Sequence, residues 1–177
     1  MEKKQSLKST IWEYVKVVIV TVILTYSLLF FVQVSRVVGH SMDPTYHNGE
    51  VVLVNKRFYK LSDVKYGDVV VAEVNFGDGD EQIIKRVIGK PGDTISCKDG
   101  VMYRNGKKLD EGYIMEDMAK ESWSYHVADG KLFVMGDNRN RSTDSRDSAV
   151  GMIDTRYIVG EAVYRIGDSQ LLLNHAE

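Results

Sequence analysis

Three polar clusters of this 177-residue chain hold residue types that could perform chemistry together. "GHSMDPT" at 39–45 places Ser41 ahead of a turn, and "IIKRVIGKPGD" at 83–93 places Lys85 within an apolar run. The third cluster is "MGDNRNRSTDSRDSAVG" at 135–151. A serine hydroxyl needs a base that takes its proton, and serine–lysine pairs are a known solution. We therefore weigh Ser41 as a nucleophile with Lys85 as its base.

Each of these clusters also has a simpler interpretation. A serine before a turn commonly caps that turn, a lysine at a strand edge can reach water along its apolar stem, and a loop rich in charge can simply be solvated. The combination argues for chemistry, because none of the histidines has an obvious carboxylate partner nearby in sequence that would make it a better base than Lys85.

The pattern around Lys85 predicts a lysine in apolar surroundings. In a strand, Lys85 shares a face with Ile83 and Val87, while Ile84, Arg86 and Ile88 share the other face. One of the two basic residues must therefore sit among apolar neighbours. Desolvation lowers the pKa of a lysine, which suits a general base, whereas an arginine stays protonated.

The third cluster is predicted to be a compact loop braced by opposite charges. The charged residues that could brace it are Asp137, Arg139, Asp144 and Arg146. Within this loop either Ser142 or Ser145 could orient the lysine amine, and the sequence pattern does not choose between them.

An apolar segment precedes the first cluster. Residues 17–35, "VVIVTVILTYSLLFFVQVS", carry no charge and would span about 28 Å as a helix, which matches the hydrocarbon core of a bilayer. "SRVVGH" follows and offers no small-residue cleavage site, so we predict an uncleaved anchor rather than a signal peptide. A buried hairpin of a soluble protein is the alternative. Residues 1–16 hold four Lys against two Glu, which predicts a cytoplasmic N-terminus and an extracytoplasmic domain at 36–177.

Residues 36–177 are predicted to form an all-β domain, a compact and partly closed antiparallel sheet. Short runs rich in Val, Ile and Tyr alternate with turn residues, and Asp99-Gly100 and Asn105-Gly106 are typical of hairpin turns. Residues 110–130 are polar without clear alternation, and we expect an excursion from the sheet there.

Composition excludes several function classes. The net charge is −2, and the chain after residue 16 has no basic stripe, which argues against a nucleic-acid partner. Cys97 is the only cysteine and the histidines lack paired metal-ligand spacing, so we expect no metal site. With no glycine-rich phosphate loop either, we expect no cofactor.

Taken in order, "SMDPT", "IIKRVIGKPGD" and "GDNRNRSTDSR" behind one anchor resemble the bacterial type I signal peptidases, particularly the small Gram-positive-type members. The resemblance covers nearly the whole chain. It implies the signal-peptidase and repressor-peptidase type of β-domain, and a membrane-bound serine endopeptidase that cleaves signal peptides after small residues at positions −3 and −1.

The resemblance also implies a role for particular residues. Ser41 would be the nucleophile and Lys85 the base, with Ser142 hydrogen-bonded to the lysine. Asp144 with Arg146, and Asp137 with Arg86, would brace the site. The backbone N–H of Ser41 would be one oxyanion donor. Some members carry a hydroxyl two places before the nucleophile, where this chain has Gly39. The residues that match the family's substrate pocket are Val37, Met42 and Ile84.

The partners that the resemblance implies are secretory preproteins and the lipid bilayer, at a position near the protein translocation channel. Two alternatives share some of these features. A self-cleaving peptidase of the repressor type has the same dyad, but a membrane span occupies the place of its N-terminal segment. A tethered β-domain that binds a partner without catalysis would be expected to lack Ser41 or Lys85.

Overall fold

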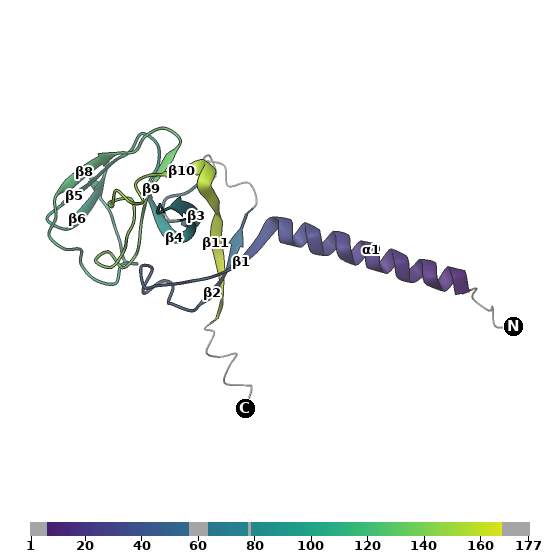
Figure 1. Cartoon of the computed structure of the whole chain (residues 1–177). Helices are drawn as coiled ribbons and strands as arrows, with labels where there is room; N and C mark the ends of the chain where they lie inside the picture. The colour runs from purple at the N-terminus through teal and green to yellow at the C-terminus, as the bar shows by residue number, and fades with distance from the viewer. Residues whose placement is uncertain (1–6, 57–63, 78, 168–177) are drawn as a thin grey trace, which may run out of the picture.

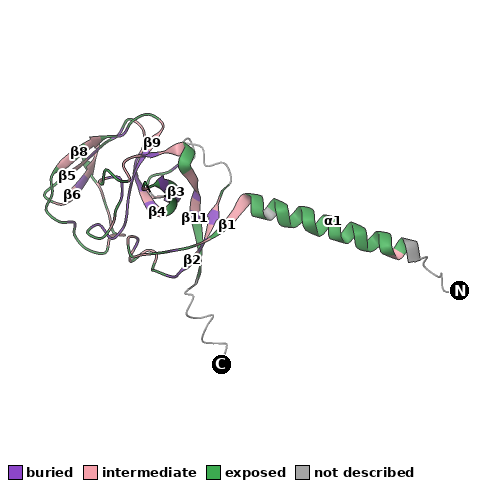
Figure 2. Cartoon of the chain, viewed as in Figure 1, coloured by how far each residue is buried: buried purple, intermediate pink, exposed green. Residues whose placement is uncertain are grey.

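The computed structural model describes residues 7–56, 64–77 and 79–167. Lys3 and Lys4, which contribute to the predicted orientation, lie outside the described residues. Helix α1, Leu7–Phe31, extends away from a body made of strands (Figure 1). Its segment Ser9–Phe31 has a mean hydropathy of 2.1 and is long and apolar enough to cross a membrane. Nearly all its described side chains are exposed (Figure 2), as expected of a helix that packs against lipid.

The apolar helix ends earlier than the sequence predicts. Val32–Arg36 forms strand β1, so the last four residues of the predicted span 17–35 are strand rather than helix. Here apolar Val32 and Val34 alternate with polar Gln33 and Ser35. Alternation with β-branched residues favours a strand. Pairing with β2 fixes the strand in the register Val32↔Asn55.

Within the described ranges eleven strands form two antiparallel sheets, which confirms the predicted all-β class. The main sheet has the order β1-β2-β11-β3-β4-β9-β10 and the smaller sheet the order β7-β6-β5-β8. The main sheet adds to β1 the strands Val51–Asn55 (β2), Val69–Asn75 (β3), Asp80–Gly89 (β4), Lys131–Met135 (β9), Ile153–Asp154 (β10) and Ile158–Gly167 (β11). The smaller sheet contains Thr94–Lys98 (β5), Val101–Arg104 (β6), Lys107–Lys108 (β7) and Trp123–His126 (β8), and a 3-10 helix spans Thr155–Tyr157.

Both predicted hairpin turns are confirmed. Asp99-Gly100 joins β5 to β6, and Asn105-Gly106 joins β6 to β7, each as a two-residue loop. Asp99 and Asn105 have φ angles of 50° and 53°, and the glycine after each is also positive. Two positive φ angles in succession match the right-handed twist of the flanking strands.

The predicted excursion at 110–130 is shorter in the structure. Residues 110–122 contain no strand or helix, but Trp123–His126 forms β8 and pairs with β5. Trp123 and Tyr125 lie on one face of β8 and pack on Phe133 with ring centroids 6.0 and 5.5 Å away. The pairing of β8 with β5 joins residues 26 to 32 positions apart, which is why a four-residue strand was not predicted.

Strand β4 contributes side chains to several hydrophobic clusters of the domain. Val87 packs in the core of the main sheet with Val134, whereas Ile88 packs in the second core with Ile95 and Phe133. Because β4 is held from both faces, the backbone that carries the predicted base is among the most fixed in the molecule.

Candidate active site

Ser41 lies in a turn-rich segment between β1 and β2, and several hydrogen bonds fix its backbone. The Asn138 N–H donates to the Ser41 carbonyl oxygen at 3.0 Å. Gly39 has a φ of 90°, a conformation that side chains disfavour, and its N–H donates to Asn48 Oδ1 at 2.9 Å. The turn therefore holds the serine against the loop that follows β9.

The structure brings Lys85 directly to Ser41. Lys85 Nζ donates to Ser41 Oγ at 2.7 Å, although the two residues are 44 positions apart. Lys85 is 5% exposed, and its backbone pairs with Val70 in β3. The amine therefore has little freedom and one hydroxyl in direct contact, which is the geometry that proton transfer requires.

Burial tunes the lysine toward its neutral form. The pKa of Lys85 is lowered from 10.5 to about 8: desolvation is the main cause and Arg146 acts in the same direction, while the carboxylates of Asp144 and Asp137 oppose the shift. The free energy that the charged amine loses by desolvation exceeds the free energy that it gains from these carboxylates. A lysine with such a pKa can release its proton near neutral pH and then accept one from a serine.

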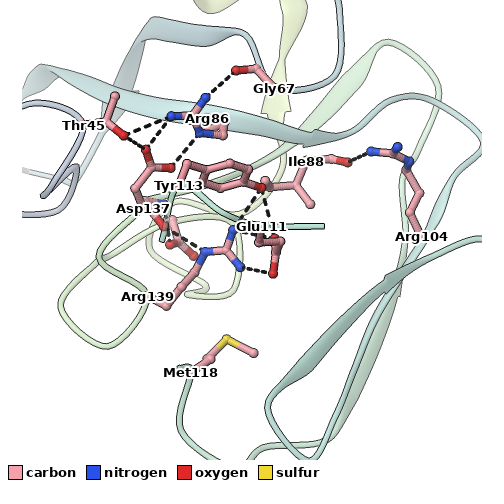
Figure 3. A network of polar contacts seen from close by, with 12 residues as sticks. Thr45, Gly67, Arg86, Ile88, Arg104, Glu111, Tyr113, Met118, Asp137 and Arg139 are labelled. Carbon is pink, nitrogen blue, oxygen red and sulfur yellow. Dashed lines mark hydrogen bonds and ion pairs between the residues drawn. The ribbon is translucent and has the colours of Figure 1, made fainter. Parts of the chain in front are cut away.

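Arg86 and Asp137 form the predicted ion pair on the other face of β4. Arg86 Nε donates to Asp137 Oδ1 at 2.7 Å, and the Thr45 hydroxyl donates to the other carboxylate oxygen (Figure 3). Arg86 also donates to the carbonyl oxygen of Gly67. Thr45 was not singled out from the sequence, although its place in "SMDPT" could have indicated it. The network connects the turn of Ser41 to the strand of Lys85.

A second buried pair extends this network into the segment after β7. The Arg139 side chain has no exposed surface and donates to both carboxylate oxygens of Glu111, at 3.0 and 2.7 Å. The Tyr113 ring lies between two guanidinium groups, 4.2 Å from that of Arg86 and 5.8 Å from that of Arg139 (Figure 3). Glu111 and Tyr113 were not predicted as supporting residues.

Asp144 and Arg146 make the predicted charged pair, and its geometry is bidentate. Arg146 Nε and Nη2 each donate to a different oxygen of Asp144 at 2.8 Å. Asp144 Oδ2 also accepts from the Gly136 N–H at 3.0 Å, and Arg146 Nη2 donates to the Arg139 carbonyl oxygen at 2.7 Å. The pair thereby closes the loop that follows β9 into one compact unit.

The predicted hydrogen bond from Ser142 to Lys85 is not formed. The Ser142 hydroxyl is buried and has no hydrogen-bond partner among the described residues, since the Lys85 amine is directed at Ser41. Ser145, the alternative, accepts from the Val134 N–H at 2.9 Å and so serves strand β9. A Cβ at Gly136 would overlap both the Ser142 hydroxyl and the Ser41 carbonyl oxygen, so glycine is needed there.

A groove of about 210 Å³ opens beside the dyad. Ser41 and Lys85 line it together with Val37 and Ile84, two of the three predicted pocket residues. Met42, the third, was predicted wrongly: it is 1% exposed and packs with Val69 in the core. Within the turn that holds Ser41, the Met42 side chain packs between Val69 and Ala162 and therefore faces the interior.

The comparisons with known proteins show the family of the chain. The family described as signal peptidase, peptidase S26, matches residues 11–166. The chain belongs to the signal peptidase family, peptidase S26. It is 38% identical to signal peptidase I of Bacillus licheniformis over 92% of each chain, and 38% identical to signal peptidase I S of Bacillus subtilis (strain 168) over 90% of each. The crystal structure of a signal peptidase I from Enterococcus faecalis V583 has a TM-score of 0.50 and 26% identity, covering 57% of this chain and 97% of that one.

The resemblance implies that the residue two places before Ser41 bears on oxyanion binding. In this chain it is Gly39, which has no side chain, and its N–H is already donated to Asn48. A second oxyanion donor must therefore come from another group. Among the described residues no cluster of three His, Cys, Asp or Glu side chains could hold a metal ion.

Proposed function

We propose that Ser41 and Lys85 form the catalytic dyad of a membrane-anchored endopeptidase that removes signal peptides from exported preproteins. The observation that carries this proposal is the contact of 2.7 Å between Lys85 Nζ and Ser41 Oγ inside a groove. Family membership supplies the reaction class, since the relatives in Bacillus bear the name signal peptidase I.

The chemistry follows from the protonation state of the lysine. With a pKa of about 8 for Lys85, roughly one molecule in ten has a neutral amine at pH 7. That amine takes the proton of Ser41 Oγ as the oxygen attacks the scissile carbonyl carbon. Lys85 then gives a proton to the leaving amine, and water hydrolyses the acyl-enzyme. The backbone N–H of Ser41 would be one donor to the oxyanion, where such a donor is worth about 3 kcal/mol.

The shape of the groove supports a preference for small residues at −3 and −1. Val37 and Ile84 reduce its width, and a volume of about 210 Å³ leaves little room beside an extended chain. One wall comes from the end of β1, the outermost strand in the main-sheet order, and the other from the first half of β4. An extended substrate would add as a strand between these walls.

The anchor supports a site of action at the membrane surface. We place α1 in the bilayer, with the basic N-terminus in the cytoplasm and the β-domain outside, near the channel through which preproteins emerge. Exposed apolar side chains on β1 and β11, among them Val34 at 63% and Tyr164 at 63%, would lie beside the lipid. A protease added to sealed right-side-out vesicles should degrade the β-domain, and complete protection would reverse the orientation.

The decisive experiment is cleavage of a purified preprotein with an Ala-x-Ala site in lipid vesicles. Ser41→Ala and Lys85→Met should each abolish cleavage while circular dichroism stays unchanged. Matched controls are Ser124→Ala on β8 and Lys98→Met at the end of β5, which should cleave as wild type does because both residues are exposed and outside the groove. Cleavage by either dyad variant would refute the assignment.

A further inference from the structure

A second hollow lies next to the nucleophile and plays no part in the mechanism above. It has a volume of about 250 Å³ and is lined by His40, Asp43, Met115, Glu116, Asn138 and Arg141. The groove of the dyad shares none of these residues. Ser41 lines the groove and His40 lines the hollow, so the two depressions meet at the nucleophile's own backbone.

Asn138 joins the wall of this hollow to the nucleophile. Its N–H donates to the Ser41 carbonyl oxygen, and its side-chain Nδ2 donates to the His40 carbonyl oxygen, both at 3.0 Å. Anything bound against Asn138 therefore lies beside the scissile bond. A substrate that places the residues before the cleaved bond in the groove must direct the residues after it to another surface, and the hollow is adjacent.

Two buried acceptors in the hollow lack partners among the described residues. Asn138 is 4% exposed and its Oδ1 accepts no hydrogen bond, and Asp43 Oδ1 likewise accepts none. The other Asp43 oxygen is held by His40 Nδ1 at 3.0 Å, which fixes the carboxylate. Buried acceptors without donors are unfavourable, so both atoms would gain from a ligand that brings N–H groups.

The charges select the ligand further. Glu116 and Arg141 contribute one charge of each sign to the lining, and Asp43 adds a second carboxylate. The ligand that fits is the start of the mature chain. It carries backbone N–H groups before cleavage, and after cleavage its new α-amine becomes an ammonium.

We propose that this hollow binds the first residues after the cleaved bond, with Asp43 and Asn138 as acceptors for their N–H groups, and that it favours a cation over an anion there. The inference rests on the proposed function and adds a second recognition site to it.

The test uses three peptide substrates that are identical up to the cleaved bond and carry Ala, Lys or Glu as the second residue after it. Full-length wild type in lipid should cleave the Lys substrate with about fivefold higher kcat/KM than the Glu substrate, the scale of a partly exposed charge pair. Asp43→Asn should bring that ratio close to one. The matched control Asp129→Asn changes an exposed carboxylate in another loop and should keep the ratio.

The outcomes separate this inference from the proposed function. Cleavage of the Ala substrate by wild type reports on the function alone, and its absence would refute the function. A wild-type ratio of one, or an unchanged ratio in Asp43→Asn, would refute the hollow as the binding site. The ratio is taken within one preparation, so it does not depend on how much protein is folded. If Asp43→Asn does not cleave, binding of the Lys and Glu peptides to Ser41→Ala with and without Asp43→Asn gives the same comparison.

Discussion

Replacing Lys85 by Met should stabilise the protein while it abolishes activity. The pKa of Lys85 falls from 10.5 to about 8 on folding, and each pKa unit is worth about 1.4 kcal/mol. The charged lysine therefore costs the folded state roughly 3 kcal/mol. Methionine fills the same space without a charge, so it removes this cost and loses only the hydrogen bond to Ser41, worth about 1 kcal/mol. We expect a net gain of about 2 kcal/mol at pH 7.

The sign of the pH dependence follows from the two pKa values. Below pH 8 the amine is charged in both states, and the full cost applies. Between pH 8 and pH 10.5 the unfolded chain binds more protons than the folded one, so wild type gains stability as the pH rises. Above pH 10.5 the amine is neutral in both states and the cost disappears. The stability advantage of Lys85→Met should accordingly shrink across this window.

Urea unfolding of the full chain in detergent, followed by tryptophan fluorescence at pH 6.5 and pH 9.5, measures both quantities. Ser41→Ala is the control, because it removes the hydrogen bond to Lys85 and keeps the buried lysine. The kcat/KM of wild type should rise with an apparent pKa of about 8. A Lys85→Met variant less stable than wild type at pH 6.5, or an advantage independent of pH, would refute the account of a desolvated lysine.

Two further substitutions test the surroundings of the dyad. Gly136→Ala should reduce kcat about 100-fold with little change in KM, because the new Cβ would displace the Ser41 carbonyl and the Ser142 hydroxyl. Steady-state kinetics would measure this loss, with circular dichroism to show that the variant is folded. A kcat equal to that of wild type would contradict the prediction. Asp137→Asn should lower the free energy of unfolding by about 3–5 kcal/mol, since Arg86 would keep a buried charge without its carboxylate. Urea titration measures this loss. A change below 1 kcal/mol would contradict the prediction and would mean that water solvates the Arg86 guanidinium in place of the carboxylate.

Local patterns predicted much of this fold. The alternation at 83–88 indicated that one of Lys85 and Arg86 sits among apolar neighbours. The two hairpin turns follow from Asn and Asp before Gly, because these residues tolerate positive φ angles. Opposite charges a few residues apart also indicated a braced loop after β9. Asp144 and Arg146 form such a pair, whereas Asp137 and Arg139 pair with residues outside the loop. Each of these features depends on neighbours in sequence.

The features that were missed depend on contacts between distant segments. Helix α1 ends at Phe31 because β2 pairs with the residues that follow. Hydropathy alone does not indicate whether those apolar residues continue the helix or form a strand. Glu111 reaches Arg139 across 28 positions, from a segment without any periodic pattern. The inward direction of Met42 likewise depends on the packing of the turn rather than on its composition.

The junction between the helix and the sheet determines how far the active site can reach. No linker separates α1 from β1, and the Lys56 N–H at the end of β2 donates to the Phe31 carbonyl oxygen at 3.0 Å. With α1 in a bilayer, the dyad cannot swing on a flexible tether, and its height above the lipid is set by the fold. The enzyme would then search for substrates in two dimensions at one fixed depth. A preprotein with its cleavable bond too far from its own apolar segment would pass above the dyad uncut.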